Sequence, residues 1–375
     1  MSERRVFFNV NELGRVAAEA VGANMCVGVE KYPDGMYNKS MLLTMDDGNE
    51  VVAKIPNPNA GLPHYTTASE VATMDFVRNI LGTPVPRVLA WNSRVEGNPV
   101  GAQYTIMERV PGVELESVWP TMPIEDRLSI VKEIAGYQKT WASTSFTMYG
   151  SMYYAADLGS EYATNMTYTD GQGNEIETSR FAIGLSTGRE LIDNKRSTVE
   201  FDRGPCKIIC RFESTLLTYV QRSSLEDYHL AIGRREIASV KQLPQLPKSP
   251  ITLCGPGTYQ PTKDRKLKAL ECYLQLIKHL LSQDQSIGTS HLWHGDLHVA
   301  NVFVNPSKPT EIVGIIDWQS TELAPLYFHT RQPQFLDFEG PQVEGLERPR
   351  LPKDIESMEE REQKRRRNLH MDQML

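Results

Sequence analysis

The chain has 375 residues, of which 40% are hydrophobic and 23% are charged, as in ordinary globular proteins, and this length allows two lobes with separate cores. Its net charge of −7, from 40 basic and 47 acidic residues, argues against nucleic acid as the main partner. The sequence has no run of about eighteen apolar residues, so no membrane span is expected.

The cysteines and the N-terminus indicate a reducing compartment. There are five cysteines, an odd set that fits reduced thiols rather than a disulfide framework. Only Cys206 and Cys210 have a spacing that metal ligands use, and no second pair completes a site, so we expect core or surface thiols. Residues 1–8 lack the apolar stretch of a secretory signal. The expected location is therefore cytoplasmic.

The first elements along the chain predict a helix followed by a β-hairpin. Apolar residues at helical spacing predict a helix over Val10–Val21. A loop, Tyr32–Lys39, precedes two strands, Ser40–Met45 and Val51–Ile55. The Asp-Gly pair between these strands suits the left-handed geometry of a hairpin turn.

Lys54 is a charged residue in the apolar second strand. Strand alternation places its side chain on the face opposite to Val51, Ala53 and Ile55. It either points to solvent, as charges on sheet edges often do, or it is held by a carboxylate.

Glu70 is the candidate for that carboxylate. In a helix predicted over Ser69–Leu81, the apolar residues four, seven and eleven positions after Glu70 lie on the same face as its side chain. A carboxylate that faces a core needs a partner, and the sequence favours an ion pair with Lys54. The alternative is a capping box in which Glu70 bonds only the amide of Thr67.

The middle of the chain changes from strands to helices. Two more strands are predicted at Arg87–Trp91 and Gln103–Arg109, the second running into a Pro-Gly turn. Helices are predicted at Glu125–Trp141 and Thr262–Leu281, whereas residues 157–261 carry no clear pattern. The charged tail, residues 356–374, is expected to be a solvated helix, with a nuclear address as the alternative.

The segment His294–Asn301, with the sequence HGDLHVAN, carries the chemistry. Four residues separate Asp296 from Asn301, so one tight loop can point both side chains at one phosphate. The apolar run Ile312–Ile316 predicts a buried strand that delivers Asp317 to the same cleft. Phosphoryl-transfer enzymes of the kinase type use an Asp, an Asn and a second Asp at this spacing as a base and two magnesium ligands.

Two other interpretations of this segment are open. Asp and Asn residues often satisfy backbone groups of turns, although a turn does not require a second Asp at the end of an apolar strand. His291, His294, Asp296 and His298 are also zinc-ligand types in close array, as a metal hydrolase would use.

Together with Ile315–Trp318, whose sequence is IIDW, this motif resembles the aminoglycoside phosphotransferase family, which is protein-kinase-like, and in particular its fungal members of the altered-inheritance-of-mitochondria type. The resemblance implies an α+β, bilobal fold with a small β-rich N-lobe at residues 1–110 and a larger, mainly helical C-lobe at 111–375. The C-lobe is expected to be shortened. The fungal relatives make a mitochondrial location the alternative to the cytoplasm.

The resemblance also implies an ATP-dependent transfer of the γ-phosphate to a hydroxyl of a small molecule, with Mg²⁺ as cofactor. The alternative is a pseudokinase or nucleotide-binding module without transfer activity, because the phosphate loop has only one glycine. The implied roles are Asp296 as catalytic base, Asn301 and Asp317 as magnesium ligands, and Gly35, Asn38, Lys54, Glu70, Glu108 and Val110 in nucleotide binding.

Overall fold

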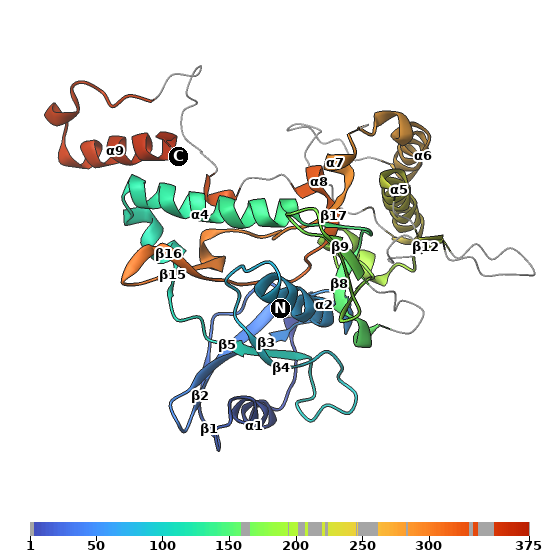
Figure 1. The fold of residues 1–375 in the computed structure, drawn as a ribbon, viewed down its shortest axis with the longest axis horizontal. Coiled ribbons are helices and arrows are strands. Elements are labelled where there is room, and N and C mark those ends of the chain that lie inside the picture. Colours follow the sequence, from blue (N-terminus) through green and yellow to red (C-terminus); the bar gives the residue numbers. More distant parts are fainter. Residues whose placement is uncertain are drawn as a thin grey trace, which may run out of the picture.

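A five-stranded antiparallel sheet with the order β1-β2-β3-β5-β4 occupies the first third of the chain in the computed structural model (Figure 1). The structure describes residues 4–158, 166–193, 195–201, 207–208, 220–221, 224–244, 246, 262–282, 284–329, 333–336 and 349–374. The strands of this sheet are β1 (Cys26–Lys31), β2 (Asn38–Met45), β3 (Glu50–Pro56), β4 (Val88–Asn92) and β5 (Tyr104–Glu108).

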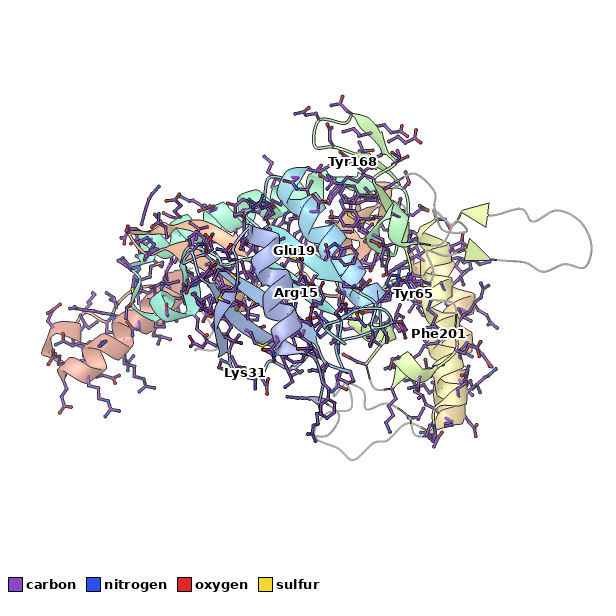
Figure 2. All side chains as sticks on the ribbon, turned by 90° about the horizontal axis from the view of Figure 1, so that it is seen from below. Arg15, Glu19, Lys31, Tyr65, Tyr168 and Phe201 are labelled. Atoms are coloured by element: carbon purple, nitrogen blue, oxygen red, sulfur yellow. The ribbon has the colours of Figure 1, made fainter. Side chains whose placement is uncertain are left out.

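Helix α1 (Val10–Val21) covers one face of this sheet and has the predicted bounds. It begins at Val10 because the Asn9 side chain accepts hydrogen bonds from the amides of Asn11 and Glu12. Its apolar side packs into a buried cluster with β2, β3 and β5. Its outer side carries the exposed Arg15 and Glu19, which Figure 2 shows on the helix in front of the sheet.

Helix α2 (Tyr65–Asn79) begins four residues earlier than predicted. Its N-cap is His64, and the Thr67 hydroxyl donates to Gln103, so the capping-box alternative for Glu70 is wrong. Almost every residue from 66 to 77 is buried, because the two-stranded sheet of β8 (Ser151–Tyr154) and β11 (Phe181–Gly184) packs on the side of α2 that a surface helix would expose.

The rest of the chain builds a larger part above α2 in Figure 1, with the long helix α4 (Ile124–Ser143) beside β16. A three-stranded sheet has the order β16-β15-β6, and a five-stranded one has the order β10-β9-β7-β14-β17. Further strands are β6 (Val113–Glu114), β7 (Ser145–Phe146), β9 (Met166–Thr169), β10 (Glu175–Thr178), β12 (Lys207–Ile208), β13 (Val220–Gln221), β14 (Ser290–Leu292), β15 (Val302–Asn305), β16 (Lys308–Ile315) and β17 (Leu323–Pro325).

The remaining helices of the described segments lie after residue 110. The α-helices are α3 (Leu115–Val118), α5 (Leu225–Gln242), α6 (Lys263–Leu280), α7 (Gln285–Gly288), α8 (Leu326–His329) and α9 (Glu360–Met374). The 3₁₀ helices are η2 (Trp119–Thr121), η3 (Ala155–Asp157), η4 (Arg189–Leu191), η5 (Arg196–Thr198), η6 (Val299–Asn301), η7 (Gln334–Leu336) and η8 (Ile355–Ser357). No helix in these described segments is long and apolar enough to cross a bilayer.

Three tryptophans join the elements around the motif. The buried Trp141 of α4 makes edge contacts with the rings of Trp293 and Trp318 at centroid distances of 5.7 and 5.5 Å. Its indole nitrogen donates to the Thr83 hydroxyl just after α2, at 3.0 Å. This core therefore fixes α4, α2 and the segment containing Asp317 to one another.

The mixed α+β fold class is confirmed, with an N-terminal antiparallel sheet and a larger, helix-rich part. The expected hairpin turn has φ 85° at Gly48. Strand β1, helix α5 and the strands between β7 and β11 were not predicted, whereas the charged tail forms the predicted helix α9. Cys206 and Cys210 lie outside the described residues.

Candidate active site

Lys54 joins the two parts of the molecule. Its Nζ lies 2.6 Å from Oε1 of Glu70 on α2 and 2.6 Å from Oδ1 of Asp317, which directly follows β16 and Ile316. Lys54 and Glu70 are 8% and 5% exposed, so the lysine does not point to solvent. The expected ion pair between Lys54 and Glu70 is present, and Asp317 binds the same ammonium group from a distant part of the chain.

The charges in this group stabilise one another. Burial acts to lower the pKa of Lys54, but the carboxylates of Asp317 and Glu70 more than offset this and raise it. Burial acts to raise the pKa of Asp317, and the ammonium of Lys54 outweighs it, so the pKa of Asp317 is lowered. Burial raises the pKa of Glu70 despite Lys54. Lys54 and Asp317 are therefore charged at neutral pH.

His294 fastens the Asp296 loop to the end of β16. Its Nδ1 accepts the amide of Asp296 at 3.2 Å, so Nε2 carries the proton and donates to the carbonyl of Ile316 at 2.9 Å. Burial lowers the pKa of His294, which keeps the ring neutral and this tautomer in place. The His294 side chain thus connects the carbonyl of Ile316 to the amide of Asp296.

Asn301 closes the same loop from its other end. Its Nδ2 donates to the carbonyl of Asp296 at 2.9 Å, and its own carbonyl accepts the amide of Ile316 at 2.9 Å. Asp317 follows with φ 63°, a left-handed conformation that non-glycine residues seldom adopt and that functional sites often retain. Three short contacts therefore set the relative positions of Asp296, Asn301 and Asp317.

The residues implied to bind Mg²⁺ fit a hard divalent cation. The second carboxylate oxygen of Asp317 and the amide oxygen of Asn301 have no hydrogen-bond donor among the residues that the structure describes. Both are oxygen ligands, which magnesium prefers, and the Asp317 side chain is 35% exposed and thus accessible from the cleft.

The zinc-hydrolase alternative is not supported. Within the described parts of the chain, no group of three or more His, Cys, Asp or Glu side chains is arranged to hold a metal. His291 faces away from the motif, with Nδ1 at 2.9 Å from the carbonyl of Thr144 and Nε2 at 2.7 Å from the hydroxyl of Thr289. His294 has both ring nitrogens in backbone hydrogen bonds.

Asp296 opens into a cavity of about 470 Å³. Its side chain is 69% exposed, and one carboxylate oxygen lies 3.6 Å from Nε2 of His298. Since Nδ1 of His298 accepts the amide of Ala300, Nε2 carries the proton that faces Asp296. The residues that line the cavity include Gln138, Arg189, Glu190, Trp293, Ser320, Glu322, Phe328 and His329.

Two of these lining residues, Glu190 and Glu322, form an acidic pair that no sequence pattern predicts, in which Glu190 is exposed and Glu322 is partly buried. Glu322 accepts a hydrogen bond from the Ser186 hydroxyl. Burial, followed by the neighbouring Glu190, raises the pKa of Glu322 well above its ordinary value. Residues 186–190 lie in the stretch without a readable pattern, so no motif pointed to them.

The loop between β1 and β2 has contacts both within itself and with residues distant in sequence. The amide of Gly35 donates to the carbonyl of Asn38 at 3.2 Å, and Asp34 pairs with Lys31 and Lys39. The side chain of Asn38 donates to Gln319, two residues after Asp317, at 2.6 Å. Gly35 and Asn38 thus both have partners within the protein.

Glu108 and Val110 lie at the end of β5, where the two parts of the chain meet. The amide of Glu108 donates to the carbonyl of Arg87, and its carboxylate pairs with the Arg87 side chain. The carbonyl of Val110 accepts from Gly112. In this described stretch the Val110 amide has no hydrogen-bond partner.

A family model described as "Phosphotransferase enzyme family" matches residues 28–174 and 209–328. A subtelomeric hrmA-associated cluster protein of Aspergillus fumigatus is 33% identical over 346 residues, which are 89% of this chain and 65% of the relative. Altered inheritance of mitochondria protein 9 of Candida tropicalis is 26% identical over 84% of this chain and 50% of its own length. The chain thus spans about half to two thirds of the curated relatives it matches.

Solved structures show weaker likeness. A putative fructosamine-3-kinase from Thermobifida fusca has a TM-score of 0.42 at 13% identity, covering 84% of this chain and 75% of its own. Aminoglycoside phosphotransferase APH(4)-Ia, in a complex with ADP and hygromycin B, has a TM-score of 0.39 at 12% identity, covering 85% and 74%. At these values the ligands of those proteins do not indicate the ligands of this chain.

Proposed function

Because this chain belongs to the phosphotransferase enzyme family, we propose that it transfers the γ-phosphate of ATP to a hydroxyl group of a small molecule. The observation that carries the proposal is the pair of bonds from Lys54 Nζ to Glu70 and Asp317. It brings a cation from the N-terminal sheet to Asp317, which in this proposal would hold the metal ion as a carboxylate does in kinases.

In this proposal Asp296 is the general base. Its carboxylate is exposed to the cavity, and its backbone is held at both the amide and the carbonyl by His294 and Asn301. An acceptor hydroxyl in the cavity would donate its proton to Asp296 as the oxygen attacks phosphorus. His298, whose Nε2–H faces Asp296, orients the carboxylate.

The donor would be held on the other side of Asp296. Lys54 supplies a fixed positive charge for the phosphates, and the amide of Val110 is free to bind the base of a nucleotide. Asp317 and Asn301 would hold Mg²⁺, which supplies the charge that neutralises the phosphates during transfer. The remaining work of the protein is positioning, which phosphoryl transfer mainly requires.

Turnover by purified protein tests this proposal. We expect magnesium-dependent consumption of ATP in a screen of small hydroxyl compounds, and a loss of roughly a thousandfold or more with either Asp296→Asn or Asp317→Asn. Arg15→Ala, on the outer side of α1, is the control and should retain full turnover. Equal turnover by the wild-type protein and both active-site variants would contradict the proposal.

One observation favours the alternative of a nucleotide-binding module without transfer. Gly35 and Asn38 are the residues implied to contact phosphates. The amide of Gly35 already donates to the carbonyl of Asn38, and the side chain of Asn38 already donates to Gln319. Such a module would bind AMP-PNP with magnesium but would not turn over ATP with any acceptor. The same screen therefore separates the two functions when binding is measured alongside it.

The location stays a proposal between two compartments. The curated relatives of the altered-inheritance type are named as mitochondrial proteins, whereas the sequence favours the cytoplasm. Fractionation of cells that express the full-length gene product would decide between them.

A further inference from the structure

The linker between β3 and α2 is a meeting point of three segments that are distant in sequence. Asn57, which is buried, donates from its side chain to the carbonyl of Met36 at 3.0 Å and from its amide to the carbonyl of Tyr37 at 2.8 Å. Met36 and Tyr37 end the loop between β1 and β2 that would cover the donor phosphates. The linker therefore holds one end of this loop.

The segment after Asp317 binds the same linker. Gln319 donates from Nε2 to the carbonyl of Ala60 at 2.8 Å and accepts from Asn38 with Oε1 at 2.6 Å. This side chain thus connects the linker with the first residue of β2. Movement of the loop relative to Asp317 would break at least one of these bonds.

Arg189 of η4 contributes the third connection. Its Nη1 donates to the carbonyls of Ala60 and Asn59 at 3.0 and 3.2 Å, and its guanidinium lies over the ring of Tyr37, 3.8 Å from the ring centre. Asp193 pairs with the other side of the guanidinium. One residue therefore contacts both the linker and the last residue of the loop.

Arg189 also lines the cavity into which Asp296 opens. Its neighbour Glu190 lines this cavity as well and contacts Glu322, five residues after Asp317. The turn η4 therefore lies between the side of the cleft where an acceptor would bind and the loop on the donor side. No sequence motif includes Arg189 or Tyr37.

We propose that Arg189 is a positioning residue, which holds the β1–β2 loop over the donor phosphates through Tyr37 from the acceptor side of the cleft. This inference rests on the proposed function, because it assumes that the loop covers a nucleotide. A planar guanidinium suits this task, since its face stacks on the ring while its edge donates to two carbonyls. Binding in the cavity and binding of nucleotide are then linked through one side chain.

A double-mutant cycle on nucleotide affinity tests the inference. The probe is AMP-PNP with excess Mg²⁺, titrated calorimetrically into the full chain. Arg189→Met and Tyr37→Leu should each weaken binding about tenfold, as expected when a cation–π contact and a charged hydrogen bond are lost. The double variant should bind no more weakly than the weaker single variant, because both residues act through one contact.

Conservative variants separate positioning from a general structural role. Tyr37→Phe keeps the ring and should bind as the wild type does, whereas Arg189→Lys keeps the charge but not the fork and should be intermediate. The control is Arg196→Met, an arginine of similar burial that pairs with Glu236 on α5, away from the loop. It should leave the affinity unchanged even where its melting temperature falls.

Two results would overturn the inference in different ways. Wild-type protein that does not bind the probe would contradict the proposed function and this inference with it. Wild-type binding that Arg189→Met leaves intact, or fully additive losses in the cycle, would contradict the inference alone. A melting temperature lowered equally in Arg189→Met and Arg196→Met, with affinity lost only in the first, supports it.

Discussion

The two sides of the cleft are held in place by different kinds of contact. Asp296, Asn301 and Asp317 are fixed by bonds among residues 294–317, a single segment of the chain. The β1–β2 loop is fixed by residues from three distant segments, namely Asn57, Arg189 and Gln319. Residues that are held by local contacts can be predicted from a sequence motif. The position of a loop that is held by distant contacts can be predicted only from the whole fold.

Lys54 connects the two sides, and its loss should have the largest effect on stability. Lys54→Met leaves the buried Glu70 without a partner, which should lower the free energy of unfolding by about 3–5 kcal/mol. Urea unfolding measures it. Lys31→Met removes an exposed pair with Asp34 and should have a far smaller effect. Similar losses in both variants would mean that the junction is not the stabilising contact we describe.

A pair of glycine substitutions tests the side that distant contacts hold. A Cβ at Gly188 would lie 2.1 Å from the carboxyl carbon of Glu322, which is bonded to Ser186. Gly188→Ala should therefore cost about 1–3 kcal/mol, because the Glu322 carboxylate must leave its hydrogen bond to Ser186. Gly136→Ala, at an open position in α4, should instead stabilise the protein by roughly 1 kcal/mol. Thermal unfolding compares the two, and equal effects would refute the tight packing at η4.

The sequence predicted the side of the cleft that a motif encodes. The spacing of Asp296, Asn301 and Asp317 was sufficient because bonds within the segment bring them together, and Glu70 could be found because helical spacing put it on the buried face of α2. The pattern could not show that Asn38 would bond to Gln319. Such pairs depend on how separate segments pack, which periodicity and spacing do not record.

The same limit explains the elements that were missed or misjudged. β1 was not predicted because it is an edge strand whose residues are mostly exposed, so its alternation is weak. α2 begins earlier than expected because its first turns are buried under the two-stranded β8–β11 sheet rather than facing water. Tertiary contacts changed what local propensity indicated in both cases.

The smallest expected effect is the pH dependence of stability that His291 contributes, just before the locally held segment. Burial lowers the pKa of His291, so the unfolded chain takes up this proton more readily than the folded protein does. Stability should be insensitive to this group above about pH 6.5, the ordinary pKa of histidine, and should fall as the pH drops below it. Against His291→Gln, the wild-type protein should lose up to about 1.4 kcal/mol more per pH unit in urea titrations at pH 5 to 8. The same change in stability with pH in both proteins would contradict this prediction.

The magnesium dependence of nucleotide affinity tests the central claim most directly, namely that Lys54, Asp317 and Asn301 form one site for phosphate and a divalent cation. AMP-PNP is titrated into wild-type protein and into Asp317→Asn, each with Mg²⁺ and with EDTA. We predict that magnesium tightens binding to the wild type at least about tenfold, and that Asp317→Asn loses this dependence. An Asp317→Asn protein that binds as tightly as the wild type, with the same response to magnesium, would contradict the account.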